Sequence, residues 1–414
     1  MEQVIVVFDI GKTNKKVCLF NRQYQLVHET VAQLPETRDE AGDPGEDLPR
    51  LTEWVLARWR EVLSQLKFEV IAVNFSTYGA SLVLLGKAGL PVAPLYNYLK
   101  PYPKYLQDQF YTLYGGEAEF SRCAASPVLG SLNSGMQLYR VKYEQSDLFG
   151  QIAWALHLPQ YFCYLFSGQC FSDCTSLGCH TNLWDFDQNQ YHRWVAAESI
   201  LDKLAPIRSA RPALSCREHP AIQVGIGLHD SSAALIPYQI SSNEPFVLIS
   251  TGTWCISLNP FNHDPLTAHE LLNDCLCYLS YEGKPVKSAR LFAGAEHEER
   301  TKQIADRFGI SPHFYHSLTY ESALDKQAAE QASPEKVYFS FMQSLVDRQI
   351  ISTRLVLTDR TPVKQIFVDG GFAKNEIYLT LLAQAFPDLR VLAAGVGQAS
   401  ALGAALAMPV NWNK

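Results

Sequence analysis

The sequence predicts a two-domain α/β protein, on three observations. The chain has 414 residues, which at about 100–200 residues per domain suggests two domains. Apolar, strand-like runs alternate with segments whose apolar residues recur at helical spacing, a mixture that favours the α/β class. A pattern of strand, glycine-containing turn and strand occurs twice, which suggests that the two domains are related.

The two copies of this pattern are residues 3–20 and 245–258. In the first, the apolar run QVIVVF ends at Asp9-Ile10-Gly11 and a second apolar run follows the polar turn. In the second, PFVLIS leads through Thr251-Gly252-Thr253 into WCISL. Each copy is typical of a β-hairpin.

The remaining elements are predicted from the same periodicities. Apolar residues at helical spacing predict a helix over 51–66, and a polar Gly/Pro-rich stretch predicts a surface loop at 39–50. We place the domain division at the polar stretch after Pro237, giving domains 1–238 and 239–414. The other expected elements are strands at 69–74, 81–85 and 365–369, helices at 337–355 and 399–407, and a buried helix over 151–168 that is broken near Pro159.

Composition excludes several classes of protein. The net charge is −7 and the chain has no long Lys/Arg run, so we expect no nucleic-acid or basic membrane surface. No window of about 18 apolar residues predicts a transmembrane helix, and the N-terminus lacks the pattern of a signal peptide. The ten cysteines lack paired C-x2-C spacing, which favours packing over metal binding. We expect a cytoplasmic protein with free thiols.

The first candidate motif is Asp9-Ile10-Gly11-Lys12-Thr13-Asn14-Lys15. A carboxylate at the end of a strand, next to a glycine turn, suits a hydrated Mg²⁺. The turn offers backbone N–H groups to phosphate at close range, and Lys15 would neutralise phosphate charge. An ordinary tight hairpin with a solvated Asp and Lys explains the same residues, and the local sequence leaves both interpretations open.

The second motif, GIGLHDSSA over residues 225–233, places Asp230 before small residues at the expected start of a helix. Phosphoryl transfer needs a group that orients the attacking hydroxyl and accepts its proton, and Asp has this role in kinases. Asp230 would alternatively serve as a helix N-cap, and the local sequence alone favours this interpretation. His229 alone is typical of a structural histidine.

Two further glycine turns are candidates for a nucleotide. Ser250-Thr251-Gly252-Thr253-Trp254 offers hydroxyl and N–H groups to phosphate oxygens, and Asp369-Gly370-Gly371 lets the backbone approach a flat ligand such as adenine. A common β-turn and a plain strand-to-helix turn are the alternatives.

The order of these motifs resembles that of the FGGY carbohydrate kinases, within the superfamily that also contains actin, hexokinase and Hsp70. The resemblance covers most of the chain, and GIGLHDSSAAL together with STGTWCISL is its most specific part. The other matching segments are FDIGKTN, IAVNFSTYGASLVLLGKAGLPVAP, LPQYFCYLFSG with the following SDCTSLGCHTNLWDF, VDGGFAKN and GQASALGAALA.

The resemblance implies two ribonuclease-H-like domains around a central cleft, and an ATP- and Mg²⁺-dependent sugar phosphotransferase with Asp230 as general base. Asp9 would match the magnesium-site carboxylate. The substrate loop would comprise Thr77, Tyr78, Gly79 and His229. The nucleotide would be held between the domains by Gly11, Thr13, Asn14 and Lys15, by Thr251, Gly252 and Thr253, and by Gly370, Gly371 and Asn375. The expected partners are the sugar and ATP, and the resemblance leaves a homodimer open.

Thr77-Tyr78-Gly79 and His229-Asp230 look most like the rhamnulokinase branch, so the expected acceptor is a ketose, such as a 6-deoxy-ketohexose or a ketopentose. The chain departs from the family at residues 96–100, which read YNYLK where a W-x-D-x-R-like stretch is usual. It also carries Gln398 where an acidic residue is usual, and it is shorter than typical members between residues 259 and 360. A sugar or nucleotide sensor on a kinase scaffold is the alternative function, although the presence of Asp9 and Asp230 argues against it.

Overall fold

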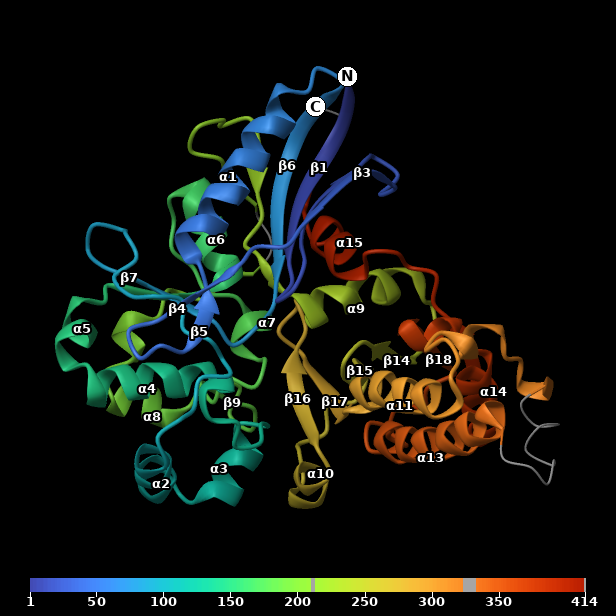
Figure 1. The fold of residues 1–414 in the computed structure, drawn as a ribbon. Coiled ribbons are helices and arrows are strands. Elements are labelled where there is room, and N and C mark those ends of the chain that lie inside the picture. The colour runs from blue at the N-terminus through green and yellow to red at the C-terminus, as the bar shows by residue number, and fades with distance from the viewer. Residues whose placement is uncertain (210–212, 323–332, 413–414) are drawn as a thin grey trace. The chain divides into compact units, whose positions relative to one another are not determined.

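The structure is a computed structural model that describes residues 1–209, 213–322 and 333–412 (Figure 1). The chain forms two compact units. Unit 1 comprises Met1–Ile240, Cys277–Lys284 and Gln398–Lys414, and unit 2 comprises Ser241–Leu276 and Pro285–Gly397. The first border lies near the predicted division at 238/239, but the C-terminal segment from Gln398 onward returns to unit 1.

Unit 1 is built on a mixed sheet in the order β11-β12-β6-β1-β2-β3, with β13 also pairing with β6. The antiparallel strands β1, β2 and β3 form one half of this sheet, and β6 continues it parallel to β1. The strands are β1 (Glu2–Ile10), β2 (Lys15–Phe20), β3 (Leu26–Ala32), β6 (Phe68–Thr77), β11 (Leu214–Ser215), β12 (Gln223–Val224) and β13 (Leu228–His229).

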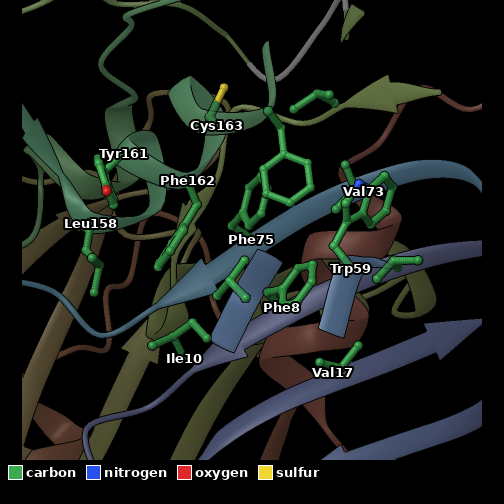
Figure 2. Packing of buried hydrophobic residues seen from close by; sticks show 14 of the residues in the cluster. Phe8, Ile10, Val17, Trp59, Val73, Phe75, Leu158, Tyr161, Phe162 and Cys163 are labelled. Atoms are coloured by element: carbon green, nitrogen blue, oxygen red, sulfur yellow. The ribbon is translucent and has the colours of Figure 1, made fainter. Parts of the chain in front are cut away.

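Alternate residues of β1 face two different cores, because successive side chains of a strand point to opposite faces of the sheet. Val4, Val6, Phe8 and Ile10 pack against α1 (Leu48–Ser64) and α6 (Leu158–Ser167). Aromatic rings dominate this layer (Figure 2): Phe75 stacks on Phe8 with ring centroids 5.9 Å apart.

The opposite face of the sheet packs against two helices, α9 (Asp230–Ser241) and α15 (Ala399–Leu406). Ile5 and Val7 of β1 contribute to this second core, together with small residues of α15 such as Ala401 and Ala404. Asp9 therefore ends β1 on the side of the sheet that α9 and α15 cover. In Figure 1, α1 and α15 lie on either side of the β1–β6 pair.

A second layer of helices and short hairpins completes unit 1. A separate core surrounds Phe110, Tyr139 and Trp194, which are fully buried. The elements of this layer are β4 (Glu36–Arg38), β5 (Pro44–Glu46), β7 (Leu82–Leu85), β8 (Trp154–His157), β9 (Trp184–Asp185), β10 (Gln190–Tyr191), α2 (Lys104–Leu113), α3 (Glu117–Cys123), α4 (Ser134–Glu144), α5 (Ser146–Gln151), α7 (Cys174–Leu177) and α8 (Arg193–Ala197).

Unit 2 repeats the strand arrangement of unit 1. Its sheet has the order β16-β17-β15-β14-β18-β19, in which β14, β15 and β17 are antiparallel and β18 and β19 run parallel to β14. The elements are β14 (Phe246–Thr251), β15 (Cys255–Asn259), β16 (Cys275–Leu279), β17 (Pro285–Leu291), β18 (Gln365–Gly370), β19 (Arg390–Ala393), α10 (Ala268–Leu272), α11 (Ala293–Phe308), α13 (Pro334–Arg354) and α14 (Glu376–Ala385). The division between units falls within β16.

Most predicted elements are present. Both glycine-turn hairpins form, as β1–β2 and as β14–β15. The broken helix over 151–168 is wrong, because residues 154–157 pair with β7 as strand β8. Pro159 does not interrupt a helix; it stands in the first turn of α6, where its missing N–H costs no hydrogen bond. The loop predicted at 39–50 is only partly correct, because it contains strand β5, whose Glu46 is buried, and its last three residues belong to α1.

Candidate active site

Asp9 is a buried carboxylate at the end of β1. It lies opposite Lys16 of β2 in the strand register, and Ser400 of α15 donates its hydroxyl to Oδ1 at 3.0 Å. Burial, together with the neighbouring charge of Asp230, raises the pKa of Asp9 to about 6 even though the charge of Lys16 lowers it. A desolvated carboxylate beside a second carboxylate is an arrangement that a bound cation stabilises.

Asp230 lies close to Asp9, at the first residue of α9. It follows β13, which pairs with β6 in parallel, so that both carboxylates stand at strand ends on the same edge of the sheet. The Ser231 N–H donates to Oδ1 at 2.6 Å and the Ser231 hydroxyl at 3.3 Å. Burial raises the pKa of Asp230 to about 6. Its side chain nevertheless keeps 34% of its surface exposed, so a ligand can reach it.

The two lysines that follow the first glycine turn point to opposite faces of the sheet. Lys15 is buried and donates to Glu46 at 2.9 Å, to the Lys12 carbonyl at 2.9 Å and to the Gly11 carbonyl at 3.2 Å. These bonds use all three ammonium hydrogens, which disfavours phosphate contact by Lys15. Lys16 lies on the same face as Asp9 and donates to Gln398 Oε1 at 2.6 Å.

The rest of the first turn is exposed to solvent. Thr13 and Asn14 are exposed, and the Gly11 N–H donates to the Asn14 carbonyl at 2.9 Å. A Cβ on Gly11 would lie 3.0 Å from that oxygen, so glycine allows the turn to close tightly.

The predicted substrate residues gather beside Asp230. Tyr78 follows β6, and its hydroxyl donates to Glu46 at 3.2 Å, while Thr77 is buried and donates to the Tyr78 carbonyl at 2.9 Å. The ring of His229 lies against Gly79, where a Cβ would come within 2.9 Å of it. Burial lowers the pKa of His229 to about 4, so the imidazole is neutral at neutral pH.

The unusual 96–100 stretch also reaches this region. Burial and then the charges of Asp230 and Glu36 raise the pKa of Tyr98, which places its phenol in the neighbourhood of the candidate base. The Tyr98 ring lies 6.0 Å from that of Tyr78. Lys100 does not face Asp230; it forms ion pairs with Asp39 and, at 2.9 Å, with Asp43.

Unit 2 contains a cavity of about 290 Å³ at the second glycine turn. Aromatic rings form part of its wall: the His297 ring lies 4.8 Å from that of Tyr315 and 5.0 Å from that of Phe372. Asn375 donates to the hydroxyl of Tyr338 at 2.7 Å and caps α14 by accepting from the Tyr378 N–H at 3.1 Å. The cavity is lined by Thr251, Gly252, Gly294, His297, Tyr315, Gly371, Phe372 and Asn375.

Two glycines let the backbone segments around this cavity come together. Gly370 has φ of +85°, and a Cβ there would lie 2.0 Å from the Thr251 carbonyl oxygen. A Cβ on Gly294 would lie 1.7 Å from the Gly252 carbonyl. Thr251 joins the two turns by donating its hydroxyl to the Asp369 carbonyl and accepting from the Phe372 N–H at 3.0 Å.

Within each unit, the structure groups most of the predicted residues. In unit 1, four of them are neighbours: Asp9, Asp230, Gly79 and His229. In unit 2, the cavity is lined by Thr251, Gly252, Gly371 and Asn375. Thr253 is exposed and does not line the cavity. Sequence reasoning missed several residues of these sites: Lys16, Tyr98, Cys179, Gly294, His297 and Tyr315. Lys16 was detectable, because hairpin pairing puts it opposite Asp9, and Tyr98 and Cys179 lie in stretches that the sequence comparison already singled out. Gly294, His297 and Tyr315 come from segments without a local motif.

Two family descriptions match the chain and together cover nearly all of it. The N-terminal domain of the "FGGY family of carbohydrate kinases" matches residues 4–233, and the "Carbohydrate kinase FGGY, C-terminal domain" matches residues 243–414. The chain belongs to the FGGY family of carbohydrate kinases. It is therefore a sugar phosphotransferase of the two-domain α/β kinase fold, and kinases of this family use ATP.

Curated relatives of this FGGY kinase include rhamnulokinases. That of Oceanobacillus iheyensis is 21% identical over 458 residues, covering 97% of this chain and 92% of that protein. A Yersinia pestis rhamnulokinase is 23% identical over 287 residues, covering 65% of this chain and 58% of that protein. These relatives agree with the rhamnulokinase-like motifs of the sequence.

Solved structures confirm the fold. A carbohydrate kinase from Novosphingobium aromaticivorans superposes with a TM-score of 0.83 at 23% identity, covering 97% of this chain and 93% of that one. A xylulose kinase from Lactobacillus acidophilus gives a TM-score of 0.80 at 15% identity, covering 98% and 88%. A glycerol kinase from Plasmodium falciparum gives 0.80 at 12% identity, covering 98% and 89%.

Two features are absent from the part of the chain that the structure describes. Among the helices of residues 1–209, 213–322 and 333–412, none is long and apolar enough to cross a membrane. The same residues contain no cluster of three or more His, Cys, Asp or Glu side chains arranged to hold a metal ion by themselves.

Proposed function

We propose that the chain transfers the γ-phosphoryl group of ATP to a hydroxyl of a ketose, with Asp230 as the general base. The observation that carries this proposal is the pair of neighbouring carboxylates, Asp9 and Asp230, whose pKa values both rise to about 6. One of them can bind a cation while the other accepts a proton, and phosphoryl transfer requires both functions.

The surroundings of Asp230 suit a base that works near neutral pH. A pKa of about 6 leaves the carboxylate ionised at pH 7 and makes it a stronger proton acceptor than an ordinary Asp. The hydrogen bonds found for it among the described residues fall on Oδ1. Oδ2 is therefore the oxygen that we assign to the sugar hydroxyl.

The residues around Asp9 fit a magnesium ion. Asp9 is desolvated, and the Ser400 hydroxyl donates to its Oδ1, so we assign its Oδ2 to a cation or a metal-bound water. Asp9 would hold the ion, which when bound neutralises charge on the transferring phosphate. We assign the cationic side chain of the first phosphate loop to Lys16, because Lys15 is committed to Glu46.

Unit 2 supplies the adenosine site in this proposal. The cavity at Gly371 and Asn375 has aromatic walls and a glycine backbone at its edge, and both features suit a flat purine. The phosphate contacts from unit 2 fall to the turn at Thr251, Gly252 and Thr253. These are the residues that the sequence predicts for the nucleotide.

The acceptor follows from the residues beside Asp230 and from the relatives. Tyr78, Gly79 and His229 form the pattern of the rhamnulokinase branch, and the curated relatives carry that name. We therefore propose a 6-deoxy-ketohexose or a ketopentose as the acceptor. Tyr98 lies near Asp230 and stands where the family usually has an acidic residue, so we propose that the acceptor meets a phenol there instead of a second carboxylate.

The test is ADP release, coupled to a spectroscopic readout, over a panel of ketoses, aldoses and polyols. The Asp230→Asn variant should retain ATP binding and lose turnover by about 100-fold or more, the usual scale for removing a general base. Asp108→Asn is the matched control, because Asp108 is an exposed partner of Lys104. Equal turnover in wild type and Asp230→Asn would disprove the base assignment. ATP binding without phosphorylation of any sugar would favour a sensor instead.

A further inference from the structure

The buried thiol of Cys179 contacts the histidine beside the candidate base. Cys179 lies just after α7 and is 1% exposed, and its Sγ is 3.1 Å from Nε2 of His229. The same Nε2 lies 3.3 Å from Oδ1 of Asp230. One imidazole nitrogen therefore faces both a thiol and the carboxylate to which we assign the proton transfer.

The position of the imidazole ring is set from two sides. A Cβ on Gly79 would lie 2.9 Å from Cδ2 of the ring and 3.0 Å from Nε2, so only glycine leaves room for the ring there. The same Cβ would lie 3.5 Å from Sγ of Cys179, which shows that the thiol and Gly79 border one small space. The ring occupies that space and is itself buried.

The contacts of the ring select one tautomer when Asp230 is ionised. A neutral imidazole carries a single N–H, and an ionised carboxylate can only accept a hydrogen bond. We therefore place the hydrogen on Nε2, which lies 3.1 Å from Sγ of Cys179 and 3.3 Å from Oδ1 of Asp230. The other nitrogen, Nδ1, then carries no hydrogen; it lies 3.5 Å from the Ser232 hydroxyl, which also contacts the Leu279 carbonyl at 3.3 Å.

From this arrangement we propose that Cys179 is a positioning residue for the proton transfer, which acts by holding His229 with Nε2 toward Oδ1 of Asp230. This inference deepens the proposed function, because it takes Asp230 as the base. Sulfur fills the space that would otherwise let the ring turn about its Cβ–Cγ bond and exchange Nε2 for the ring carbon Cε1. With Oδ1 engaged by His229 and Ser231, Oδ2 stays directed at the acceptor hydroxyl.

The kinetic test compares Cys179→Ala, Cys179→Ser and Cys163→Ala. Misplacement of a reacting group by about 1 Å can cost about 100-fold in rate, so we expect a reduction of about tenfold in kcat for Cys179→Ala, with KM for ATP unchanged. Cys179→Ser keeps a polar atom in the space and should recover most of the rate. Cys163 is equally buried in the core of unit 1, with Sγ 3.9 Å from the Ser167 hydroxyl, and Cys163→Ala should leave kcat unchanged.

A second readout does not depend on sugar turnover. Long-range ¹H–¹⁵N spectra report which nitrogen of each histidine carries the proton, and His229→Gln identifies the His229 signals. We expect the Nε2–H tautomer at pH 7.5 in the wild type, a mixture in Cys179→Ala and a return toward Nε2–H in Cys179→Ser. An unchanged tautomer in Cys179→Ala would overturn the proposal, even if kcat fell. Failure of the wild type to phosphorylate any sugar would count against the proposed function alone, since the spectra test the positioning independently.

Discussion

The two oxygens of Asp230 have different surroundings, and this difference determines what the residue can do. Oδ1 accepts from the Ser231 N–H at 2.6 Å and faces His229, whereas the carboxylate as a whole keeps a third of its surface exposed. A carboxylate that is fixed through one oxygen and accessible through the other is oriented without being blocked. Asp9 has a similar arrangement, with Ser400 on Oδ1.

This arrangement predicts an acidic limit to activity. Since burial raises the pKa of Asp230 from 3.8 to about 6, kcat/KM for the sugar should fall below about pH 6 and level off above pH 7. The measurement is kcat/KM between pH 5 and 9 at saturating Mg-ATP, with Asp108→Asn as the control. Asp9 titrates in the same range, so the inflection belongs to the pair of carboxylates. A value of kcat/KM that stays constant down to pH 5 would contradict the prediction.

The same pKa shift makes the free energy of unfolding fall as the pH rises, whereas activity rises over that range. The folded protein binds this proton more tightly than the unfolded chain, so ionisation destabilises the free protein as the pH rises from 3.8 to about 6. Active-site carboxylates of this kind reduce the stability of the fold, and a bound cation relieves part of that cost.

At the scale of elements, α15 connects the C-terminal segment to both candidate carboxylates. Its Ser400 donates to Asp9, and its Gly403 packs against the backbone of α9, the helix that begins at Asp230. The preceding Gln398 accepts from Lys16 and donates to Glu29 at 2.7 Å. The neutral amide of Gln398 does not compensate the positive charge of Lys16, whereas the acidic residue usual in the family would form an ion pair with it.

Gly403→Ala should therefore destabilise unit 1. A Cβ at Gly403 would lie 1.8 Å from the Ala233 carbonyl oxygen, and since that atom is backbone, the helices must move apart. We expect a loss of about 1–3 kcal/mol in the free energy of unfolding, the usual cost of overpacking, measured by urea denaturation. Gly395→Ala is the control, because a Cβ there meets nothing within 4 Å. Equal stability of the two variants would refute the close packing of α15 on α9.

Elements were predictable where the sequence has a regular period, and sites were predictable where a motif is contiguous. The two hairpins, α1 and α15 follow from apolar spacing, and Asp9 and Asp230 follow from motifs.

The side of the sheet on which a lysine lies depends on strand register, so the motif singled out Lys15 although Lys16 faces Asp9. Cys179 and His297 reach their sites through tertiary packing that no local pattern encodes. The strand at 154–157 was missed because its partner, β7, lies far away in sequence.

At the scale of the whole molecule, one strand topology occurs twice and each copy carries different residues at the corresponding turn. The β1–β2 turn of unit 1 carries Asp9, and the β14–β15 turn of unit 2 carries Thr251 and Gly252 beside an aromatic cavity. The carboxylates for chemistry are thus in one unit and the proposed adenosine cavity is in the other. The return of the C-terminal segment to unit 1 means that the units are not simply successive halves of the chain.

This division of roles predicts that a change in the cavity of unit 2 affects ATP and not the sugar. Gly371 lines the cavity, and a Cβ there meets nothing closer than the Thr251 carbonyl at 3.9 Å, so Gly371→Val fits the fold while filling space that the nucleotide needs. We expect KM for ATP to rise about tenfold or more, equivalent to about 1.4 kcal/mol of lost binding, with KM for the sugar and the melting temperature unchanged.

Gly370→Ala is the contrasting variant. Its Cβ would meet the Thr251 carbonyl at 2.0 Å and its φ of +85° disfavours any side chain, so this change should lower the melting temperature. Initial rates with ATP and sugar varied independently, together with thermal denaturation, separate the two effects. If Gly371→Val raised KM for the sugar and left that for ATP unchanged, the adenosine would have to bind elsewhere, and the cavity of unit 2 would lose its assignment.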